Sequence, residues 1–515
     1  MFFPPRQPAV QSAAQAAVVR PQFLLLLSVF TLTAVAWGTC VVTGWQGSEL
    51  QRFLLLLGGY GLLTGAFLVS RVDASYAQFF EVPVFVTALA FVAFGIAPLL
   101  TFLDPNQLDP HFHGSYDLTF TAFLYVVFGM LAYWLGSQLV RSRKRRGDAI
   151  GYAIEHQTLP RASHMVWIVL LCLVSSAAKG YLLWTHFYGY VLYGYPGSIP
   201  AYFQKLPTVQ LVMWIAELGT CALALASIER FSHPSSGFRR ALFWVVFASE
   251  CGWGLIAGIK SSIVLSFVLV ALISTLIRRR VRKSWVVAAA LSLVVIYPIS
   301  NRYRAILERQ QADLGTLASV ESAQHWALAE AARCRPGVSG WMASGWQDAL
   351  IRLNLLQDFA LMLSLGPAQS RLAGNERLWM IPYYPFLPRF VWRTKPILNK
   401  GQRFTELLGA SGASLRGYTA VTAPGDLYVL FGIPGVLGGM LLMGAAGEWL
   451  TARFTTFRDK RSLFVYSVIF LEAVDLEIDC FSYWTRLLKM LAILGVLGWL
   501  IYGPLKSDLG AHHTS

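Results

Sequence analysis

The stretch DLYVLFGIPGVLGGMLLMGAAG, residues 426–447, carries one charged side chain, Asp426, in twenty-two residues. A helix rises 1.5 Å per residue, so this one is long enough to cross the roughly 30 Å hydrocarbon core of a bilayer. Hydrophobic residues make up 56% of the chain and charged residues 13%, about half the charged fraction of an ordinary soluble domain. We therefore predict an all-α polytopic membrane protein.

Eleven further apolar runs bring the predicted number of transmembrane helices to about twelve. They fall near residues 22–43, 52–70, 82–103, 118–140, 164–185, 208–228, 240–258, 261–277, 284–300, 462–474 and 487–503, and the run at 462–474 is short. Nine spans form an N-terminal bundle over 1–300, and three form a C-terminal group over 426–515. The segment between them, 301–425, is predicted to be one large loop with short helices near 308–333 and 344–365.

Lysine and arginine in the short loops predict the orientation, because short loops rich in these residues stay in the cytoplasm. The sequences RSRKRR (141–146), RRRVRK (278–283) and RDKR (458–461) all fall on one side of the predicted bundle. The loops on the other side are acidic or neutral. This pattern places both termini in the cytoplasm and the 301–425 loop outside it.

The 301–425 loop is basic although it is predicted to lie outside. It has fourteen Arg and Lys against eight Asp and Glu, an excess of six positive charges. Long loops escape the charge rule that governs short ones, so the excess requires another cause. An anionic ligand at the outer surface is the cause that we predict.

The most basic part of this loop is PYYPFLPRFVWRTKPILNKGQRF, residues 382–404, which we name the basic ribbon. Three prolines in its first seven residues predict an extended, pre-ordered segment. Arginine and lysine bind phosphate oxygens, and rings such as Trp392 stack on sugars or lie among lipid headgroups. We expect Arg389 and Lys395 to contact a phosphate-linked lipid or glycan, and Lys400 to lie at the headgroups. The alternative is a loop held on anionic lipid.

Further cations are predicted to converge on the same outer face, at helix ends or within the loop and the ribbon. They are Lys260, Arg302, Arg304, Arg352, Arg393 and Arg403. A pyrophosphate carries several negative charges, so several cations are needed to neutralise it.

Ionisable residues inside predicted spans are candidates for function. Lys179, Glu217 and Glu250 are of this kind. A structural Lys179–Glu217 ion pair is predicted, and the sequence assigns no partner to Glu250. The acidic and histidine-bearing outer segments, 104–117 and 475–479, lack the ligand spacing of a metal site, so we predict no metal and no cofactor.

Three neighbouring sequences resemble a known signature: LPRFVWRTKP, then GQRF, then TAPGDLYVLFGIPGVLGGMLLMG. They resemble bacterial oligosaccharide repeat-unit polymerases, the Wzy-like members of the O-antigen polymerase and ligase superfamily. The matching positions are Arg389, Lys395, Pro396, Gly401, Phe404, Thr422, Asp426, Phe431, Gly432 and Gly435. Arg352 and Asp358 resemble the helix that precedes this signature. Leu387 and Arg393 depart from the usual pattern, but neither departure removes a cation.

The resemblance implies glycan polymerisation at the periplasmic face of the bacterial inner membrane. A chain carried on undecaprenyl pyrophosphate would be transferred to a sugar hydroxyl of the next lipid-linked repeat unit, without a metal. The implied partners are this lipid-linked glycan and membrane lipids, with a chain-length regulator (co-polymerase) and a flippase, and no nucleic acid. The reaction requires cations at the leaving group and a base for the hydroxyl proton. Asp426 is the first candidate base, and His325 and Glu217 are the others. The alternative for Asp426 is a structural place at the start of its helix, and a strongly dissociative step needs no base.

Three other functions stay open at this point. An O-antigen ligase would use the same leaving group with a different acceptor. A lipid-linked glycan transporter or flippase would carry charge along a central cavity, whereas the predicted cations lie at one outer mouth. A scaffold subunit of an export complex would use the basic loop to dock a protein.

Overall fold

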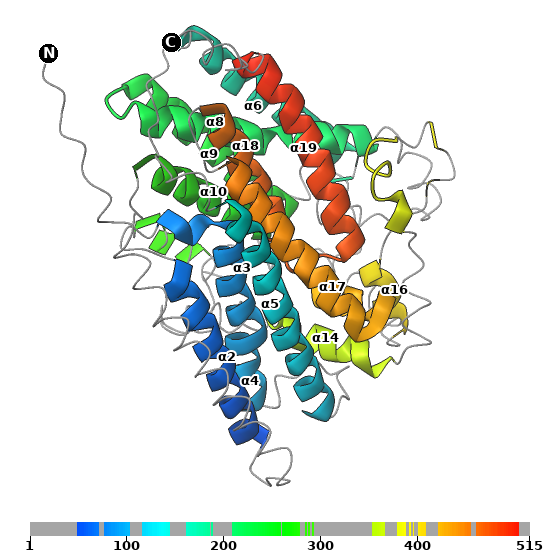
Figure 1. Cartoon of the computed structure of the whole chain (residues 1–515). Helices are drawn as coiled ribbons and strands as arrows, with labels where there is room; N and C mark the ends of the chain where they lie inside the picture. Colours follow the sequence, from blue (N-terminus) through cyan, green and yellow to red (C-terminus); the bar gives the residue numbers. More distant parts are fainter. Residues whose placement is uncertain are drawn as a thin grey trace, which may run out of the picture.

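The computed structural model describes eleven stretches, five pairs of residues and one single residue. They are 49–71, 77–103, 116–144, 161–185, 187–188, 209–258, 260–278, 353–365, 378–387, 391–392, 395, 400–407, 421–454 and 460–503, with 284–285, 287–288 and 291–292. Within these ranges every regular element is a helix (Figure 1). The prediction of an all-α chain is confirmed there.

The helices follow the apolar runs of the sequence. The N-terminal ones are α2 (Glu49–Arg71), η1 (Ala77–Phe80), α3 (Val82–Phe91), η2 (Val92–Ile96), α4 (Ala97–Leu103), α5 (Tyr116–Lys144), α6 (Arg161–Trp184), α8 (Leu218–Ser232), α9 (Gly237–Ala257) and α10 (Lys260–Arg278). The C-terminal ones are α14 (Leu355–Ser364), η5 (Leu378–Met380), α16 (Lys400–Leu407), α17 (Ala423–Phe454), α18 (Lys460–Ala473) and α19 (Cys480–Tyr502).

Nine helices of the described residues are long and apolar enough to cross a membrane, and each coincides with a predicted span. This architecture is that of a membrane protein. The predicted span at 22–43 lies outside the described residues, and only three pairs of residues are described within 284–300. Most of the 301–425 loop, including the helix predicted at 308–333, is also outside them.

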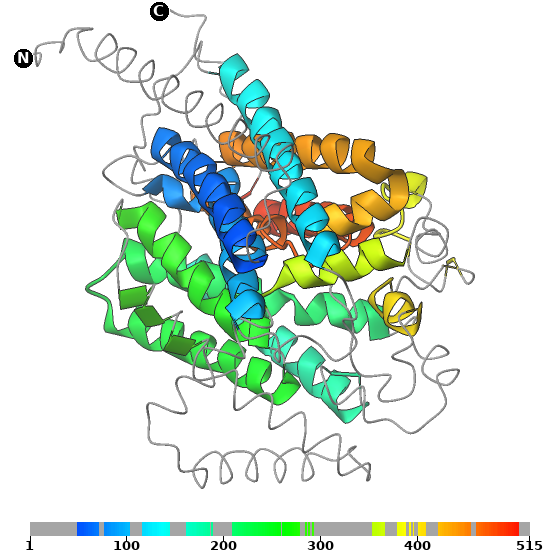
Figure 2. The same ribbon diagram turned by 90° about the horizontal axis from the view of Figure 1, so that it is seen from below.

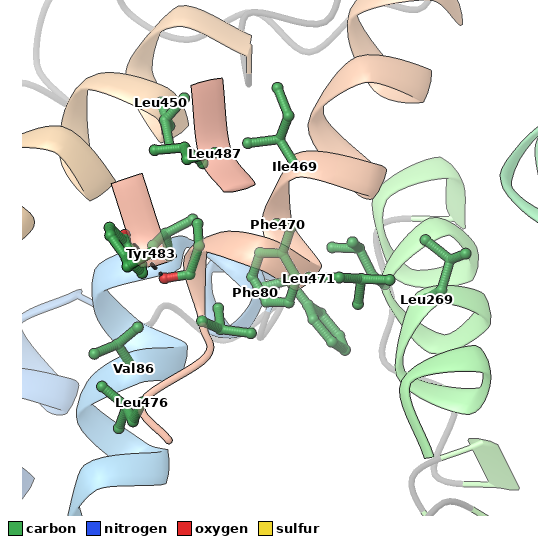
Figure 3. Packing of buried hydrophobic residues seen from close by; sticks show 14 of the residues in the cluster. Phe80, Val86, Leu269, Leu450, Ile469, Phe470, Leu471, Leu476, Tyr483 and Leu487 are labelled. Atoms are coloured by element: carbon green, nitrogen blue, oxygen red, sulfur yellow. Dashed lines mark hydrogen bonds between the residues drawn. The ribbon is translucent and has the colours of Figure 1, made fainter. Parts of the chain in front are cut away.

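The run at 462–474 forms α18, a helix of 14 residues, and the chain continues through 474–479 to the start of α19, beside the start of α17. Nearly every residue from Leu463 to Ala473 is buried, as expected for a helix that is packed on all sides. Seen from below, α18 and α19 lie between the α5–α17 pair and the α8–α10 group (Figure 2). Phe470 of α18 packs on Phe80, and Leu269 of α10 belongs to the same buried cluster (Figure 3). α18 is therefore a core helix of the bundle.

The α5–α17 pair is the most extensive helix contact of the described residues. Two glycines permit it: a Cβ atom on Gly136 would overlap the Leu441 carbonyl oxygen, and one on Gly444 would overlap the Tyr133 carbonyl oxygen. Small residues allow this close backbone approach in membrane helices. α17 breaks at Gly432, whose φ of 67° and ψ of −154° are not helical, two residues before Pro434.

Helix ends that were predicted to share the cytoplasmic face meet at two buried ion clusters. In one, Arg71 at the end of α2 pairs with Glu448 of α17 at 2.7 Å and also bonds Ser137 of α5. In the other, Glu229 near the end of α8 is surrounded by two cations and two histidines, from three neighbouring helices and its own C-terminal turn. They are Lys460 at 3.1 Å, His164 at 3.3 Å, Arg239 at 3.5 Å and His233 at 3.7 Å. These contacts agree with the predicted alternation of the helices.

Two local predictions in the loop were wrong. The helix predicted over 344–365 is not continuous, because a turn at Leu353 precedes α14 and the Asn354 side chain caps it by accepting from Gln357 N at 3.3 Å. Asn favours this capping role over a helix interior. The proline-rich start of the ribbon is coiled rather than extended: Tyr384 N bonds Met380 O at 2.8 Å, and Leu387 N bonds Tyr383 O at 3.1 Å. The φ that proline fixes suits turns as well as extended chain.

Candidate functional site

A buried ion pair joins the ribbon to the bundle. Lys400, the first residue of α16, places Nζ 2.7 Å from Asp426 Oδ1 in the first turn of α17. The Lys400 side chain is 1% exposed and the Asp426 side chain is 0% exposed. The other carboxylate oxygen, Oδ2, accepts from the backbone N of Cys480 at 2.9 Å. Asp426 therefore links α16, α17 and the start of α19.

Local sequence explains why these helix starts meet. Thr422 accepts a hydrogen bond from Gly425 N at 3.1 Å and so caps α17, while Asp479 accepts from Ser482 N at 2.8 Å and caps α19. A bond from Ala423 N to Leu476 O, 3.3 Å, ties the two caps together. Because helix N-termini are positive, one carboxylate at both starts is favoured electrostatically.

α14 closes this end of the bundle over Gly425. A Cβ atom at Gly425 would lie 2.6 Å from Met362 Sδ and 2.8 Å from Thr422 Oγ1, so a larger residue would displace one of these side chains. Phe359 of α14 packs against Tyr428 of α17 at 6.2 Å, and Tyr428 stacks on Tyr125 of α5 at 5.4 Å. The segments that carry the signature therefore form one packed unit.

Lys395 fixes the ribbon. Its Nζ donates to Tyr384 O at 2.7 Å and to Leu387 O at 2.8 Å, and it lies 4.2 Å from the centre of the Tyr384 ring. The residue is 2% exposed. The Tyr384 ring in turn packs edge-on against Phe481 of α19 at 5.1 Å. These contacts give Lys395 a role in positioning the coiled turns, and its contact with a phosphate stays a prediction.

A row of aromatic rings lies on the same turns. Trp379 and Tyr383 are 5.6 Å apart, Tyr383 and Trp392 are 5.8 Å apart, and Trp379 is 61% exposed. Trp392 is half-buried in this row, consistent with a flat face that a sugar or a headgroup could meet.

The other predicted site residues are placed as follows. The prediction that Lys400 lies at the headgroups was wrong, because its side chain is 1% exposed and pairs with Asp426 inside the protein. Gly258, in the left-handed conformation, ends α9. Lys260 begins α10 two residues later. Six residues lie outside the described ranges: Arg302, Arg304, His325, Arg352, Arg389 and Arg393. The backbone of Arg403 belongs to α16, and its side chain is not described.

The predicted Lys179–Glu217 pair was also wrong. Lys179 pairs instead with both oxygens of Glu250, at 2.7 and 2.8 Å, and Glu217 pairs with Lys489 of α19 at 2.6 Å. Sequence separation gave no guide to these partners, because α9 and α19 pack beside these residues only in the folded bundle. The signal that could have found Lys489 is its presence, with Arg486, in an otherwise apolar helix.

The three predicted bases differ in their surroundings. Both oxygens of Asp426 are engaged, whereas Glu217 Oε2 has no hydrogen-bond partner among the described residues.

Within the same described part of the chain, no three His, Cys, Asp or Glu side chains are grouped as a metal site requires. No protein-family model matches the chain, and neither the curated proteins nor the solved structures compared with it include a match.

Proposed function

We propose that this chain is a bacterial membrane glycosyltransferase that polymerises oligosaccharide repeat units carried on undecaprenyl pyrophosphate. One observation supports the proposal most. The segments that resemble the polymerase signature pack together at one end of the bundle: α14, the ribbon turns, α16 and the first turn of α17, around the buried Lys400–Asp426 pair. A signature spread over about one hundred residues is thus gathered into one place, as a site requires.

In the proposed reaction, the bond between the anomeric carbon of the growing chain and its pyrophosphate carrier breaks. A new bond forms between that carbon and a hydroxyl oxygen of the incoming repeat unit, and the hydroxyl proton leaves to a base. The ribbon cations, Arg389 first, would neutralise the pyrophosphate as it departs. Lys395 and the Lys400–Asp426 pair would act as positioning residues, because their polar atoms bond groups of the protein.

The proposed location is the inner membrane, with the ribbon on the periplasmic side and both termini in the cytoplasm. Support comes from the charge of the short loops and from the meeting of helix ends at the Arg71 and Glu229 clusters. A flippase that delivers repeat units and a chain-length regulator are the proposed partners.

The test is the lipid-linked glycan that accumulates in a strain lacking this protein. Single repeat units exposed to the periplasm are expected. Completed chains left on the carrier would indicate a ligase instead, and units held on the cytoplasmic side would indicate a flippase. In the complemented strain, Arg389→Ala should abolish chain extension at an unchanged protein level; chains of normal length would contradict the assignment of Arg389.

A further inference from the structure

Five ionisable side chains gather on the α18–α19 side of the bundle. Lys489 of α19 pairs with Glu217 at 2.6 Å, and Arg486, one turn earlier, lies 3.6 Å from Asp475. Glu472, at the end of α18, interacts electrostatically with all four. We name these residues the mixed-charge cluster. It has two cations and three carboxylates, so its net charge is −1 when all are ionised.

Charged side chains of the mixed-charge cluster lie well below the starts of their helices and are nevertheless exposed. Arg486 is six residues into α19 and Lys489 is nine, which places them about 9 and 13 Å below the start of that helix. Glu217 is eight residues into the span Val209–Ser232, or about 12 Å. The Arg486 side chain is 53% exposed and the Glu217 side chain 38%. Charges that face hydrocarbon at such depths are strongly unfavourable, which favours a polar space beside these two side chains.

The chemistry of the cluster selects the kind of ligand for that space. A phosphate site needs an excess of positive charge, and here the carboxylates outnumber the cations. Carboxylates accept hydrogen bonds, while Arg and Lys donate them. A sugar carries many hydroxyl groups, each of which both donates and accepts.

The cluster is also continuous with the site at the start of α19. Asp479, the cap of α19, interacts electrostatically with both Asp475 and Asp426. A ligand whose phosphates meet the ribbon could therefore extend its sugars along α19 toward Lys489. We infer that the mixed-charge cluster is a sugar-binding subsite for the glycan part of the lipid-linked substrate. This inference rests on the proposed function for the identity of that substrate.

The first test asks whether the cluster faces water. Arg486→Cys is compared with Val496→Cys, which lies on the same helix at an apolar position that is 59% exposed. The full chain in lipid nanodiscs is treated with a membrane-impermeant maleimide, and the labelling of the unsubstituted protein is subtracted. Arg486→Cys should label several-fold faster than Val496→Cys. Equal labelling of the two positions would overturn the inference.

The second test asks which part of the substrate is bound. Lys489→Met is compared with the unsubstituted chain and with Arg240→Gln, an exposed charge on α9. The two probes are undecaprenyl pyrophosphate that carries one repeat unit and undecaprenyl pyrophosphate alone. Lys489→Met should weaken binding of the first probe about tenfold, the loss expected for a hydrogen bond to a charged group. Binding of the bare carrier should not change.

Equal weakening of both probes by Lys489→Met would overturn the inference, since it would indicate an anion site or a folding defect. Neither test requires turnover. If the deletion strain excluded a polymerase while both tests gave the expected result, the cluster would still be a sugar subsite of a ligase or a transporter. If the deletion strain supported a polymerase and either test failed, the inference alone would fall.

Discussion

Lys400 Nζ lies 2.7 Å from Asp426 Oδ1, and neither side chain reaches the surface. The pair connects the ribbon to two helix starts, because Asp426 Oδ2 also accepts from Cys480 N. Removing one member of a buried ion pair leaves an unpaired charge in a medium that solvates it poorly. Removing both members leaves an apolar contact that costs far less.

We therefore expect Lys400→Met or Asp426→Leu alone to destabilise the protein by about 3–5 kcal/mol. The double variant Lys400→Met/Asp426→Leu should recover a large part of this loss, although the Cys480 N–H then lacks its acceptor. Thermal unfolding of the purified protein, with protein level in the membrane, measures both effects. A double variant that is as unstable as the sum of the single variants would show that the two residues act independently.

Gly219 provides a test of the second buried pair. A Cβ atom at this position would overlap Glu250 Oε1 and lie 2.6 Å from Ser175 Oγ, so Gly219→Ala should displace Glu250 from Lys179. Overpacking of this kind costs about 1–3 kcal/mol. Gly252→Ala on α9 is the matched control, because nothing lies within 4 Å of its added carbon. Unfolding temperatures that fall equally in both variants would contradict the assigned geometry.

The Asp475–Arg486 contact predicts a pH dependence. Burial raises the pKa of Asp475 above its usual value near 3.8, while the charge of Arg486 opposes the shift. The folded protein then keeps this proton to a higher pH than the unfolded chain does. The stability that this proton contributes is complete below the pKa that Asp475 has in the unfolded chain. It is lost as the pH rises through the pKa that Asp475 has in the folded protein.

The corresponding experiment compares the wild type with Asp475→Asn, which cannot titrate. The difference in unfolding temperature, wild type minus variant, should fall as the pH rises from about 3.5 to about 7. A difference that grows over this range would mean that Arg486 outweighs burial and lowers the pKa.

Lys395 distinguishes positioning from direct binding. In Lys395→Met the carbonyl oxygens of Tyr384 and Leu387 lose their shared donor, so the turns over 378–387 should loosen. Hydrogen exchange in these residues should speed up markedly, while α17 exchanges as before. Chain extension should fall as well, because Arg389 follows these turns. If hydrogen exchange over 378–387 stayed as slow as in the wild type while Lys395→Met no longer extended chains, Lys395 would instead be assigned to direct binding of the substrate.

The spans were predictable from the sequence because length and hydropathy are properties of a continuous segment. Each of the nine helices in the described residues that could cross a membrane coincides with an apolar run. Composition did not reveal that α18 is packed on all sides, since an apolar helix that is buried by neighbours has the same composition as one that faces lipid. Its short length, 14 residues, was the one feature of the sequence that indicated a buried helix.

The partners of charged residues were not predictable in the same way. Asp426 was singled out by its place at the start of an apolar run, but its contact with Lys400 depends on where α16 folds back. Lys179 was matched to Glu217 because consecutive helices are neighbours, whereas Glu250 is the carboxylate that reaches it. Charge pattern thus located the groups that matter, and packing decided which of them meet.

The close approach of α5 and α17 is the feature of the bundle that a single methyl group can test. Gly444→Ala would bring a carbon onto the Tyr133 carbonyl oxygen, whereas Gly438→Ala on the same helix meets nothing within 4 Å. Backbone atoms cannot move aside as a flexible side chain can, so Gly444→Ala should cost at least the roughly 1–3 kcal/mol typical of overpacking. Gly438→Ala should be neutral or slightly stabilising, since Ala favours helix over Gly. Unfolding temperatures of the two variants in one detergent decide the point, and equal values would mean that the two helices do not cross at these residues.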